Sequence, residues 1–403
     1  MTVVDLGAYG PDFTADPYPY YAKLRESGPV HEIRTPHGER LWLIIGHREA
    51  RAALADPRLS KSPATVGGSM LDERVIGPNL LVVDPPDHTR LRGLVAREFT
   101  ARRVAGLRER IQHITDELID AMLPAGQGDL VDSLSYPLPI TVICDLLGVP
   151  AADREAFRAW TTQIVAPGGP AGEYSAIHEI GAYFTELIED KRCAGPSDDL
   201  ISALLRTRAE DGDRLSAAEL RAMAYLLLIA GHETTVNLIT NGVHALLSHP
   251  DQLAALREDF GLLDGAVEEM LRYEGPVLNS TVRFTGESVT VGDTVIPAYE
   301  TVLVSLGAAG RDPARYPEPD CFDIRRTATA TATGAKGQNH GHLAFGHGIH
   351  HCLGAPLARL EARIAIRTLL ERCPDLTLDA DTGPLDWLPG MLIRGVRGLP
   401  VRW

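Results

Sequence analysis

Long apolar runs and closely paired cysteines are missing from this chain of 403 residues, and its basic residues are fewer than its acidic ones. No segment approaches about 18 consecutive apolar residues, the length that spans a bilayer, so we expect no membrane span. The N-terminus shows neither a basic segment nor an apolar one, which argues against a secretory signal. Together these absences predict a cytoplasmic protein that does not bind a membrane.

Cysteine is also scarce. The five cysteines are widely spaced and include no CxxC pair, which argues against a disulfide framework, a zinc ribbon or an iron–sulfur cluster. The net charge of −15 disfavours generic nucleic-acid binding. Apolar residues make up 44% of the chain, enough for a sizeable core, and no linker or internal repeat divides it. We therefore expect one domain that spans residues 1–403.

The positive charge that is present is concentrated in two places. Arg359, Arg363 and Arg367 recur every four residues in a predicted helix and therefore share a face. A second cluster comprises Arg90, Arg92, Arg97, Arg102, Arg103, Arg108 and Arg110. A solvated helix face explains each arginine taken alone, whereas together they suit a basic docking surface for an acidic electron donor.

Apolar residues at helical spacing dominate the chain, including residues 101–123, 136–149 and 176–192. The longest pattern begins at Ser216, where Glu219 completes a capping box, and stops before Pro250. At about 30 residues it is roughly 45 Å long, enough to cross a whole domain. Strand-like runs are few and cover residues 40–46 and 282–306. The predicted fold is mostly α with a small β region and a long central helix.

Cys352 stands in the glycine-rich segment FGHGIHHCLG, between a strand-like lead-in and a helix-like exit. Gly346 and Gly348 permit backbone angles that other residues resist, and Gly354 lets a flat ligand come close. Amides that open the following helix favour negative charge on the sulfur. Such a thiolate can be the axial ligand of haem iron, although a lone cysteine in a turn is more often structural.

A second unusual segment, AGHETT at residues 230–235, interrupts the long apolar helix pattern. A buried acid beside a hydroxyl is costly unless it is hydrogen-bonded or functional. Gly231 weakens the helix where Thr234 can bond a backbone carbonyl, which would open a kink or groove. Glu233 and Thr234 can also relay protons through water. The alternative is a tolerated polar turn on a partly exposed face.

The cysteine segment resembles the haem-ligand loop of the cytochrome P450 family, whose pattern is matched by Phe345, Gly348, Cys352 and Gly354. AGHETT is similar to the oxygen-activation motif of the same family. The resemblance implies the cytochrome P450 fold, with the long helix over a buried haem b. It implies Cys352 as the thiolate ligand to the iron and Phe345 as a shield for the sulfur.

The resemblance also implies roles for other residues. Glu233 and Thr234 are the catalytic acid and hydroxyl, and Ala230, Gly231, Gly346 and Gly354 belong to the cofactor site. Glu269, Arg272 and Arg315 form a structural ion network. The haem propionates are bound by His88, Arg92, Arg283 and His350. The residues expected around the substrate are Met70, Leu227, Val277, Leu278, Asn279, Thr281, Met391 and Leu392.

Nearly the whole chain resembles actinobacterial members that hydroxylate macrolides and other polyketides. This implies a monomeric monooxygenase that hydroxylates or epoxidises a bulky, largely apolar secondary metabolite, as in antibiotic biosynthesis. It would use O2 and electrons that pass from NAD(P)H through a ferredoxin reductase and a ferredoxin. No carboxylate lies in NLLVV, residues 79–83, to bind a basic amino sugar, and Asp72 and Glu73 are the nearest acids upstream. A neutral substrate or an aglycone therefore fits as well.

Other functions agree with parts of the pattern. A terpenoid or steroid-like substrate is the alternative within the family. A zinc hydrolase would use the ligand-rich run of His340, His342, His347, His350, His351 and Cys352, although a helical HExxH is missing. A haem sensor or electron carrier without turnover is a third interpretation, and the proton relay predicted in AGHETT argues against it.

Overall fold

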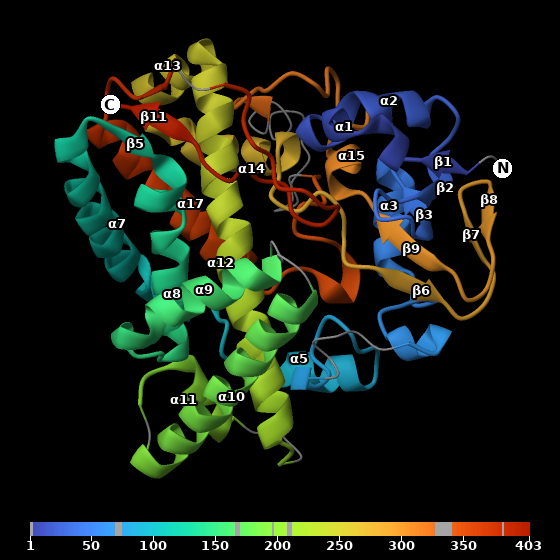
Figure 1. Ribbon diagram of the computed structural model, residues 1–403, viewed down its shortest axis with the longest axis horizontal. Coiled ribbons are helices and arrows are strands. Elements are labelled where there is room, and N and C mark those ends of the chain that lie inside the picture. The colour runs from blue at the N-terminus through green and yellow to red at the C-terminus, as the bar shows by residue number, and fades with distance from the viewer. Residues whose placement is uncertain are drawn as a thin grey trace.

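The computed structural model describes residues 3–68, 75–165, 170–195, 197–207, 212–326, 341–380 and 383–403. A large helical part lies beside a smaller region of β-sheet, with the N-terminus at the sheet and the C-terminus among the helices (Figure 1). The prediction of a mostly α protein with a small β region is confirmed.

The helices are α1 (Pro11–Ala15), α2 (Tyr18–Arg25), α3 (His47–Ala55), α5 (Asp87–Ala96), α6 (Ala101–Gly106), α7 (Arg108–Met122), α8 (Pro137–Leu147), α9 (Arg154–Val165), α10 (Pro170–Ala194), α11 (Leu200–Arg206), α12 (Ala217–Ser248), α13 (Pro250–Glu258), α14 (Leu263–Tyr273), α15 (Leu306–Gly310) and α17 (Ala355–Arg372). The strands are β1 (Val4–Asp5), β2 (Val30–Arg34), β3 (Arg40–Ile44), β4 (Leu59–Ser60), β5 (Gln127–Asp129), β6 (Arg283–Thr285), β7 (Val289–Val291), β8 (Thr294–Ile296), β9 (Thr301–Val304), β10 (Thr377–Leu378) and β11 (Pro400–Arg402).

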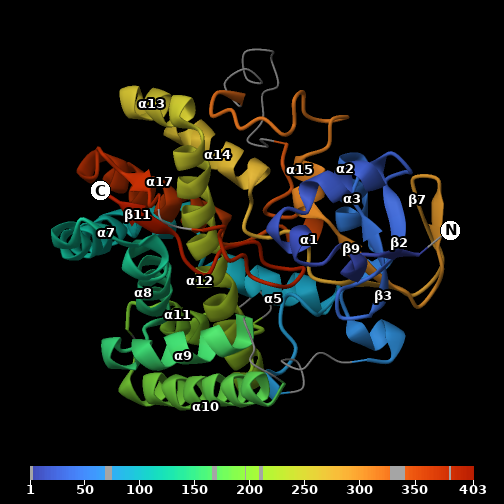
Figure 2. The ribbon, with the colours of Figure 1, turned by 45° about the horizontal axis from the view of Figure 1, so that its top comes forward.

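Helix α12 passes through the middle of the helical part in both ribbon views (Figures 1 and 2). The Ser216 hydroxyl accepts the Glu219 amide, and the Glu219 carboxylate accepts the Ser216 amide, so the predicted capping box is present. The helix ends before Pro250, as predicted. Its length and composition also suit a membrane span, but 61% of its most apolar window is buried inside the protein, as in the core helix of a globular domain.

The main core forms where α8, α10, α14 and α17 pack around α12. Small residues allow this close packing. A Cβ at Gly231 would lie 2.9 Å from Ile143 Cδ1 of α8, and a Cβ at Gly242 would lie 2.6 Å from the Met270 sulfur of α14. Each fully buried leucine or isoleucine in this core contributes roughly 1.5–3 kcal/mol. Because α12 carries apolar residues around most of its circumference, burial is most favourable when it lies among the other helices.

The larger sheet has the strand order β1-β2-β3-β9-β6-β4. Strand β9 pairs in parallel with β3 and antiparallel with β6, so that Val302 lies opposite both Trp42 and Arg283. All three residues of β6 are buried. The predicted strand that carries Arg283 into the core is confirmed, and this strand brings the arginine to the site described next.

Candidate active site

The loop that precedes α17 is closed by a hydrogen bond from the Cys352 amide to the Phe345 carbonyl at 2.8 Å. Gly346 and Gly348 have φ angles of 72° and 76°, in the left-handed region, so the predicted need for glycine at both positions is confirmed. A Cβ at Gly348 would also lie 3.0 Å from Ala55 Cα of α3. The glycines thus allow the loop to turn tightly against α3.

The Cys352 sulfur accepts the amides of Gly354 and Ala355 at the start of α17, as predicted. Burial nevertheless raises the pKa of the Cys352 thiol, and those amides together with the charges of Arg92 and Arg359 act against this rise. The free side chain is therefore a thiol. A metal ion that replaces the proton would turn it into a thiolate.

A mostly apolar cavity separates Cys352 from α12, and Cys352 is accessible from this cavity. The predicted cofactor residues on its wall are Arg92, Ala230, Gly231, Arg283, Phe345, Gly346, His350, Cys352 and Gly354. Of the predicted set only His88 is not part of the wall, and it lies directly behind it. The His88 and His350 ring centres are 4.2 Å apart.

Several buried nitrogen groups gather around Arg283. Its guanidinium donates to the carbonyls of Leu54 and Leu59 at 3.1 and 3.2 Å, and its Nε has no partner among the described residues. His88 is 1% exposed, and neither of its ring nitrogens has a hydrogen-bond partner in the described part of the chain. Burial and the neighbouring charges of His88, Arg283 and Lys61 lower the pKa of His350 to about 3.

Lys61 is a further cation on the wall that sequence reasoning missed. Its side chain is buried and donates to the Val282 carbonyl at 2.7 Å and to the Thr281 hydroxyl. Burial and the charge of Arg283 lower the pKa of Lys61 to about 7, while Asp84 acts in the opposite direction. A lysine in a short polar loop carries no sequence signal that would have distinguished it.

This wall fits a flat apolar group that carries carboxylates. Arg92, Arg283 and Lys61 can bind carboxylates, which would also satisfy the unpaired nitrogens of Arg283 and His88. Apolar side chains can pack on the faces of the group. Cys352 offers the sulfur ligand that haem iron accepts. The residues present therefore fit the haem that the sequence resemblance implies.

The AGHETT residues of α12 do not all face the cavity. Thr234 lies on the wall, and its hydroxyl donates to the Ala230 carbonyl at 2.9 Å, as predicted for a groove in the helix. The Glu233 carboxylate points away from the wall and accepts the Asn237 side-chain amide at 3.2 Å. Of the two predicted catalytic residues, only Thr234 therefore lines the cavity, and Glu233 would need a side-chain rotation to reach it.

Glu361 of α17 is a second wall residue that sequence reasoning missed. It is 1% exposed, and its Oε2 has no partner among the described residues. Burial raises the pKa of Glu361 well above the usual carboxyl range. This side chain is therefore a neutral acid. In the sequence it is indistinguishable from the many acids of an amphipathic helix.

Some of the predicted substrate residues line the cavity and others do not. Leu227, Val277 and Thr281 lie on the cavity wall, together with Ser280. The structure does not place Leu278, Asn279, Met391 or Leu392 on this wall. Leu278 is buried in the core below α2, and its amide donates to the Leu392 carbonyl, while the Asn279 side chain donates to the Met391 carbonyl. These four residues connect the segment at 278–279 to the segment at 391–392 by hydrogen bonds. Met70, Asp72 and Glu73 lie outside the described residues.

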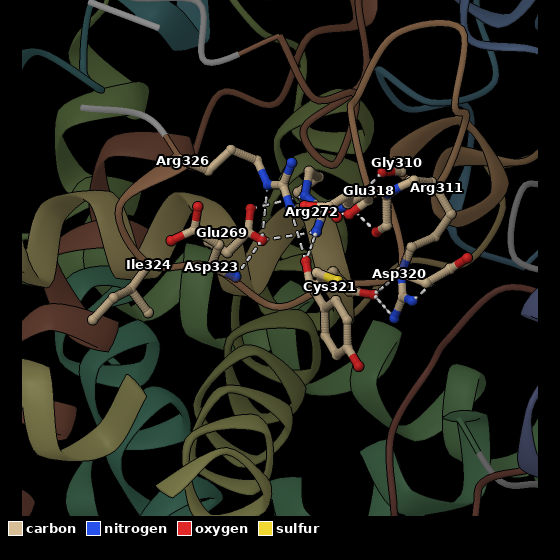
Figure 3. A network of polar contacts seen from close by, with 12 residues as sticks. Glu269, Arg272, Gly310, Arg311, Glu318, Asp320, Cys321, Asp323, Ile324 and Arg326 are labelled. Carbon is tan, nitrogen blue, oxygen red and sulfur yellow. Dashed lines mark hydrogen bonds and ion pairs between the residues drawn. The ribbon is translucent and has the colours of Figure 1, made fainter. Parts of the chain in front are cut away.

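The predicted ion network contains one wrong member. Arg272 binds Glu269 through Nε and Nη2 at 2.8 and 2.7 Å, and both side chains are buried. The third member is Arg326, whose contact with Glu269 is drawn in Figure 3. Its Nε lies 3.1 Å from Glu269 Oε1. Arg315 instead lies beside the Tyr316 ring, 5.2 Å from its centre. The segment that carries Arg326 is held against Glu269, because the Asp323 amide also donates to Glu269 Oε1, at 2.9 Å.

Glu268, the neighbour of Glu269, forms a separate buried network below the Cys352 loop. Its carboxylate accepts Arg359 Nε at 2.6 Å and Nη2 at 2.9 Å, and it also accepts His342 Nε2 at 2.9 Å. The Ala344 amide donates to His342 Nδ1 at 3.2 Å, so the hydrogen of this ring sits on Nε2. Of the three arginines that were predicted to share a face, Arg359 is therefore largely used inside the protein, and its side chain is 24% exposed.

The other arginines of the predicted docking surface mostly pair with acids of their own chain. The pairs are Arg90 with Asp213 and Glu219, Arg103 with Glu98, Arg110 with Asp145, Arg363 with Asp264 and Arg367 with Glu371. The side chain of Arg363 is still 33% exposed and that of Arg367 57% exposed. The surface is thus less positive than the sequence suggests, but guanidinium groups still face solvent.

The histidine run does not form a zinc site in the described part of the chain. No group of three His, Cys, Asp or Glu side chains there is arranged to hold a metal ion. His342 binds Glu268 and His350 packs on His88, so these histidines point to different partners. His340 lies outside the described residues.

Comparison with known proteins agrees with this site. The family model for Cytochrome P450 matches residues 173–394. Cytochrome P450 monooxygenase PikC of Streptomyces venezuelae is 58% identical over 404 residues, covering 100% of this chain and 94% of the relative. The 6-deoxyerythronolide B hydroxylase of Saccharopolyspora erythraea is 43% identical and covers 100% and 99%. The tirandamycin C-bound structure of P450 monooxygenase TamI has a TM-score of 0.87 and 41% identity, covering 99% of both chains.

Proposed function

The chain belongs to the cytochrome P450 family, and we propose that this monooxygenase hydroxylates or epoxidises a bulky, largely apolar macrolide or other polyketide. Family membership implies an oxidoreductase that acts on a small molecule with O2 and a redox partner, and a haem with a thiolate ligand. The observation that carries the proposal is the cavity, which joins Cys352 to Thr234 and has on its wall Arg283 and Lys61, both of which donate to backbone carbonyls.

The cofactor of the proposal is haem b, with Cys352 as its ligand. When bound, a thiolate-ligated haem supplies O2 activation through cleavage of the O–O bond. Arg92, Arg283 and Lys61, together with His350, would bind its carboxylates. Phe345 covers the sulfur from within the loop. Each of these side chains lies on the cavity wall.

The remaining residues control protons and water. The Thr234 hydroxyl on the wall orients a water molecule, and Glu233 provides the proton that this water passes on. Apolar side chains such as Leu227 and Val277 keep bulk water out of the cavity, which prevents protons from reaching the reaction by other routes.

The substrate class follows from the relatives and the wall together. PikC, the 6-deoxyerythronolide B hydroxylase and TamI relate the chain to enzymes of macrolides and other polyketides. The few hydroxyl groups on the wall, at Thr234, Thr235, Ser280 and Thr281, offer single hydrogen bonds within an apolar surface. Such a wall suits a large ring with scattered oxygen atoms.

The electron supply of the proposal is a ferredoxin with its reductase and NAD(P)H. The exposed guanidinium groups of Arg363 and Arg367 are the docking side for the acidic ferredoxin. The protein acts in the cytoplasm as a monomer, with residues 1–403 as one catalytic unit.

A titration of the ferric holoprotein tests the substrate class. The probes are 6-deoxyerythronolide B, tirandamycin C, testosterone and a sesquiterpenoid acid, and the readout is the high-spin shift of the Soret band. The first two should shift the band at micromolar concentrations and then yield products with one added oxygen atom from 18O2. A shift with testosterone or the sesquiterpenoid alone would overturn the polyketide assignment in favour of a terpenoid or steroid-like substrate.

A further inference from the structure

His232 lies inside α12 without solvent exposure, and its hydrogen bonding defines its tautomer. Nδ1 is 2.8 Å from the Leu228 carbonyl, and because a carbonyl only accepts, Nδ1 carries the hydrogen. Nε2 therefore presents a lone pair. This nitrogen has no hydrogen-bond partner among the described residues, which is unusual for a fully buried polar atom.

The carboxyl of Glu233 lies close to this lone pair. Its Oε2 is 3.8 Å from His232 Nε2, and its other oxygen accepts Asn237 Nδ2 at 3.2 Å. Asn237 is itself buried and also donates to the Glu233 carbonyl at 2.8 Å. His232 and Asn237 thus flank the carboxyl on the side of α12 that faces away from the cavity. A small rotation of either side chain would bring Nε2 and Oε2 within hydrogen-bond distance.

The pKa shifts of the two groups agree with this geometry. Burial lowers the pKa of His232 to about 4, so the imidazole is neutral. Burial raises the pKa of Glu233, against the effect of the Asn237 hydrogen bond. From the neighbouring segment the Tyr136 ring meets His232 edge-on at 5.9 Å, and it brings no charge. A neutral imidazole acceptor therefore faces a carboxyl that favours its acid form.

We propose that His232 is a positioning residue that holds the Glu233 carboxylic acid away from the cavity by accepting its O–H at Nε2. The inference rests on the proposed function and adds to it a resting position for the acid. From this position Glu233 turns toward Thr234, gives one proton to the water there and regains one from water afterwards. His232 stays neutral throughout, so that the cycle leaves no charge inside α12.

The test is the infrared difference spectrum between the substrate-free ferric holoprotein and its Glu233→Gln variant, which isolates the carbonyl band of the Glu233 acid. Wild type should show this band at a wavenumber lowered by hydrogen bonding. His232→Leu and the shorter His232→Asn should raise the wavenumber. His232→Gln, whose amide oxygen can accept at a similar distance, should return the band close to its wild-type position.

Two controls separate positioning from folding. The red-shifted band of the reduced CO complex should be present in every variant that is compared. The double variant His232→Leu/Glu233→Gln should show no further change in the carboxylic acid region relative to Glu233→Gln. Absence of the acid band from wild type, or a band that stays in place in both His232→Leu and His232→Asn, would overturn the inference.

The measurement needs neither substrate nor turnover, so its failure differs from that of the proposed function. If no polyketide probe binds but the band moves as expected, only the substrate assignment fails. If the polyketide probes bind and are oxidised while the band does not move, only the role of His232 fails.

Discussion

The guanidinium carbon of Arg359 lies 4.4 Å from the centre of the Phe345 ring. The Phe345 carbonyl also accepts the Cys352 amide, so Phe345 contacts both the arginine and the cysteine. Glu268 holds Arg359 in place by two hydrogen bonds. A positive charge is thereby kept close to the sulfur, where it favours added negative charge at the metal that the sulfur would bind.

Removal of this charge should lower the reduction potential of the holoprotein. For Arg359→Leu we expect a fall on the order of tens of millivolts. The variant should also lose roughly 3–5 kcal/mol of stability, because the buried Glu268 keeps its charge without its main partner. Arg359→Leu/Glu268→Gln should recover stability and part of the potential, because the opposing charge of Glu268 is removed as well. Spectroelectrochemical titration of both proteins measures the potential, and equal values in wild type and the two variants would contradict this role.

Glu268 should also make the free energy of unfolding depend on pH. Its burial acts to raise its pKa, but the hydrogen bonds from Arg359 and His342 outweigh this and lower the pKa to about 2. A depressed pKa stabilises the fold above the unfolded value and loses this contribution as pH falls toward the folded value. Wild type should exceed Glu268→Gln by roughly 3 kcal/mol near neutral pH, and the gap should shrink between about pH 5 and pH 2. Urea unfolding across this range is the measurement, and a constant gap would argue against the ion network.

The corrected ion network predicts different effects for two arginines. Arg326→Ala removes a hydrogen-bond donor to the buried Glu269 and should cost roughly 1–3 kcal/mol, with less haem incorporated per protein. Arg315→Ala is the matched control and should stay within roughly 0.5 kcal/mol. Thermal melts and the haem-to-protein absorbance ratio measure both effects. The reverse order of the two variants would restore Arg315 to the network.

Thr234→Ala should separate oxygen use from product formation. Without the hydroxyl on the wall, the water that delivers the proton is no longer oriented, so more of the oxygen should leave as hydrogen peroxide. Glu233→Gln should instead slow the whole cycle. Thr235→Val is the control, because Thr235 also lies on the wall and also bonds a backbone carbonyl, that of Gly231 at 3.4 Å, but it is given no role in the proton delivery. Product and peroxide per NAD(P)H are measured with a bound probe, and unchanged coupling in Thr234→Ala would refute its role.

The docking surface predicts a salt-dependent effect on reduction. Arg363→Glu and Arg103→Glu should each slow reduction by an acidic ferredoxin, most strongly at low salt, because steering is screened over roughly 8–10 Å at physiological ionic strength. Arg40→Glu in β3 is the control on the sheet, away from α17 (Figure 1). The measurement is the rate of reduction by stopped flow across a series of salt concentrations. Rates that fall equally in Arg40→Glu would point to net charge rather than a docking surface.

Local chemistry explains which features could be predicted from the sequence. The turn around Gly346 and Gly348, the capping box at Ser216 and the buried strand at Arg283 each depend on neighbouring residues, which a sequence displays directly. Thr234 likewise bonds a carbonyl one helical turn away. In all these cases the partner of a residue lies within a few positions of it or in the same element.

Long-range choices could not be predicted in this way. Arg315 and Arg326 both follow Arg272 in a proline-rich segment, and only the path of the backbone decides which of them reaches Glu269. Lys61 and Glu361 reach the cavity wall from distant segments, and nothing beside them in the sequence marks them. The Glu233 carboxylate accepts the Asn237 amide instead of lining the wall, and the sequence does not show which rotamer a side chain adopts.

The central claim is that Cys352 provides a thiolate to haem iron, and the spectrum of the reduced, CO-bound protein tests it most directly. Wild type should show the strongly red-shifted Soret band that depends on thiolate donation. Cys352→His should lose this shift and all monooxygenase activity even if haem remains bound, because imidazole donates less electron density. If Cys352→His keeps both the red-shifted band and turnover, Cys352 is not the ligand and the account is contradicted.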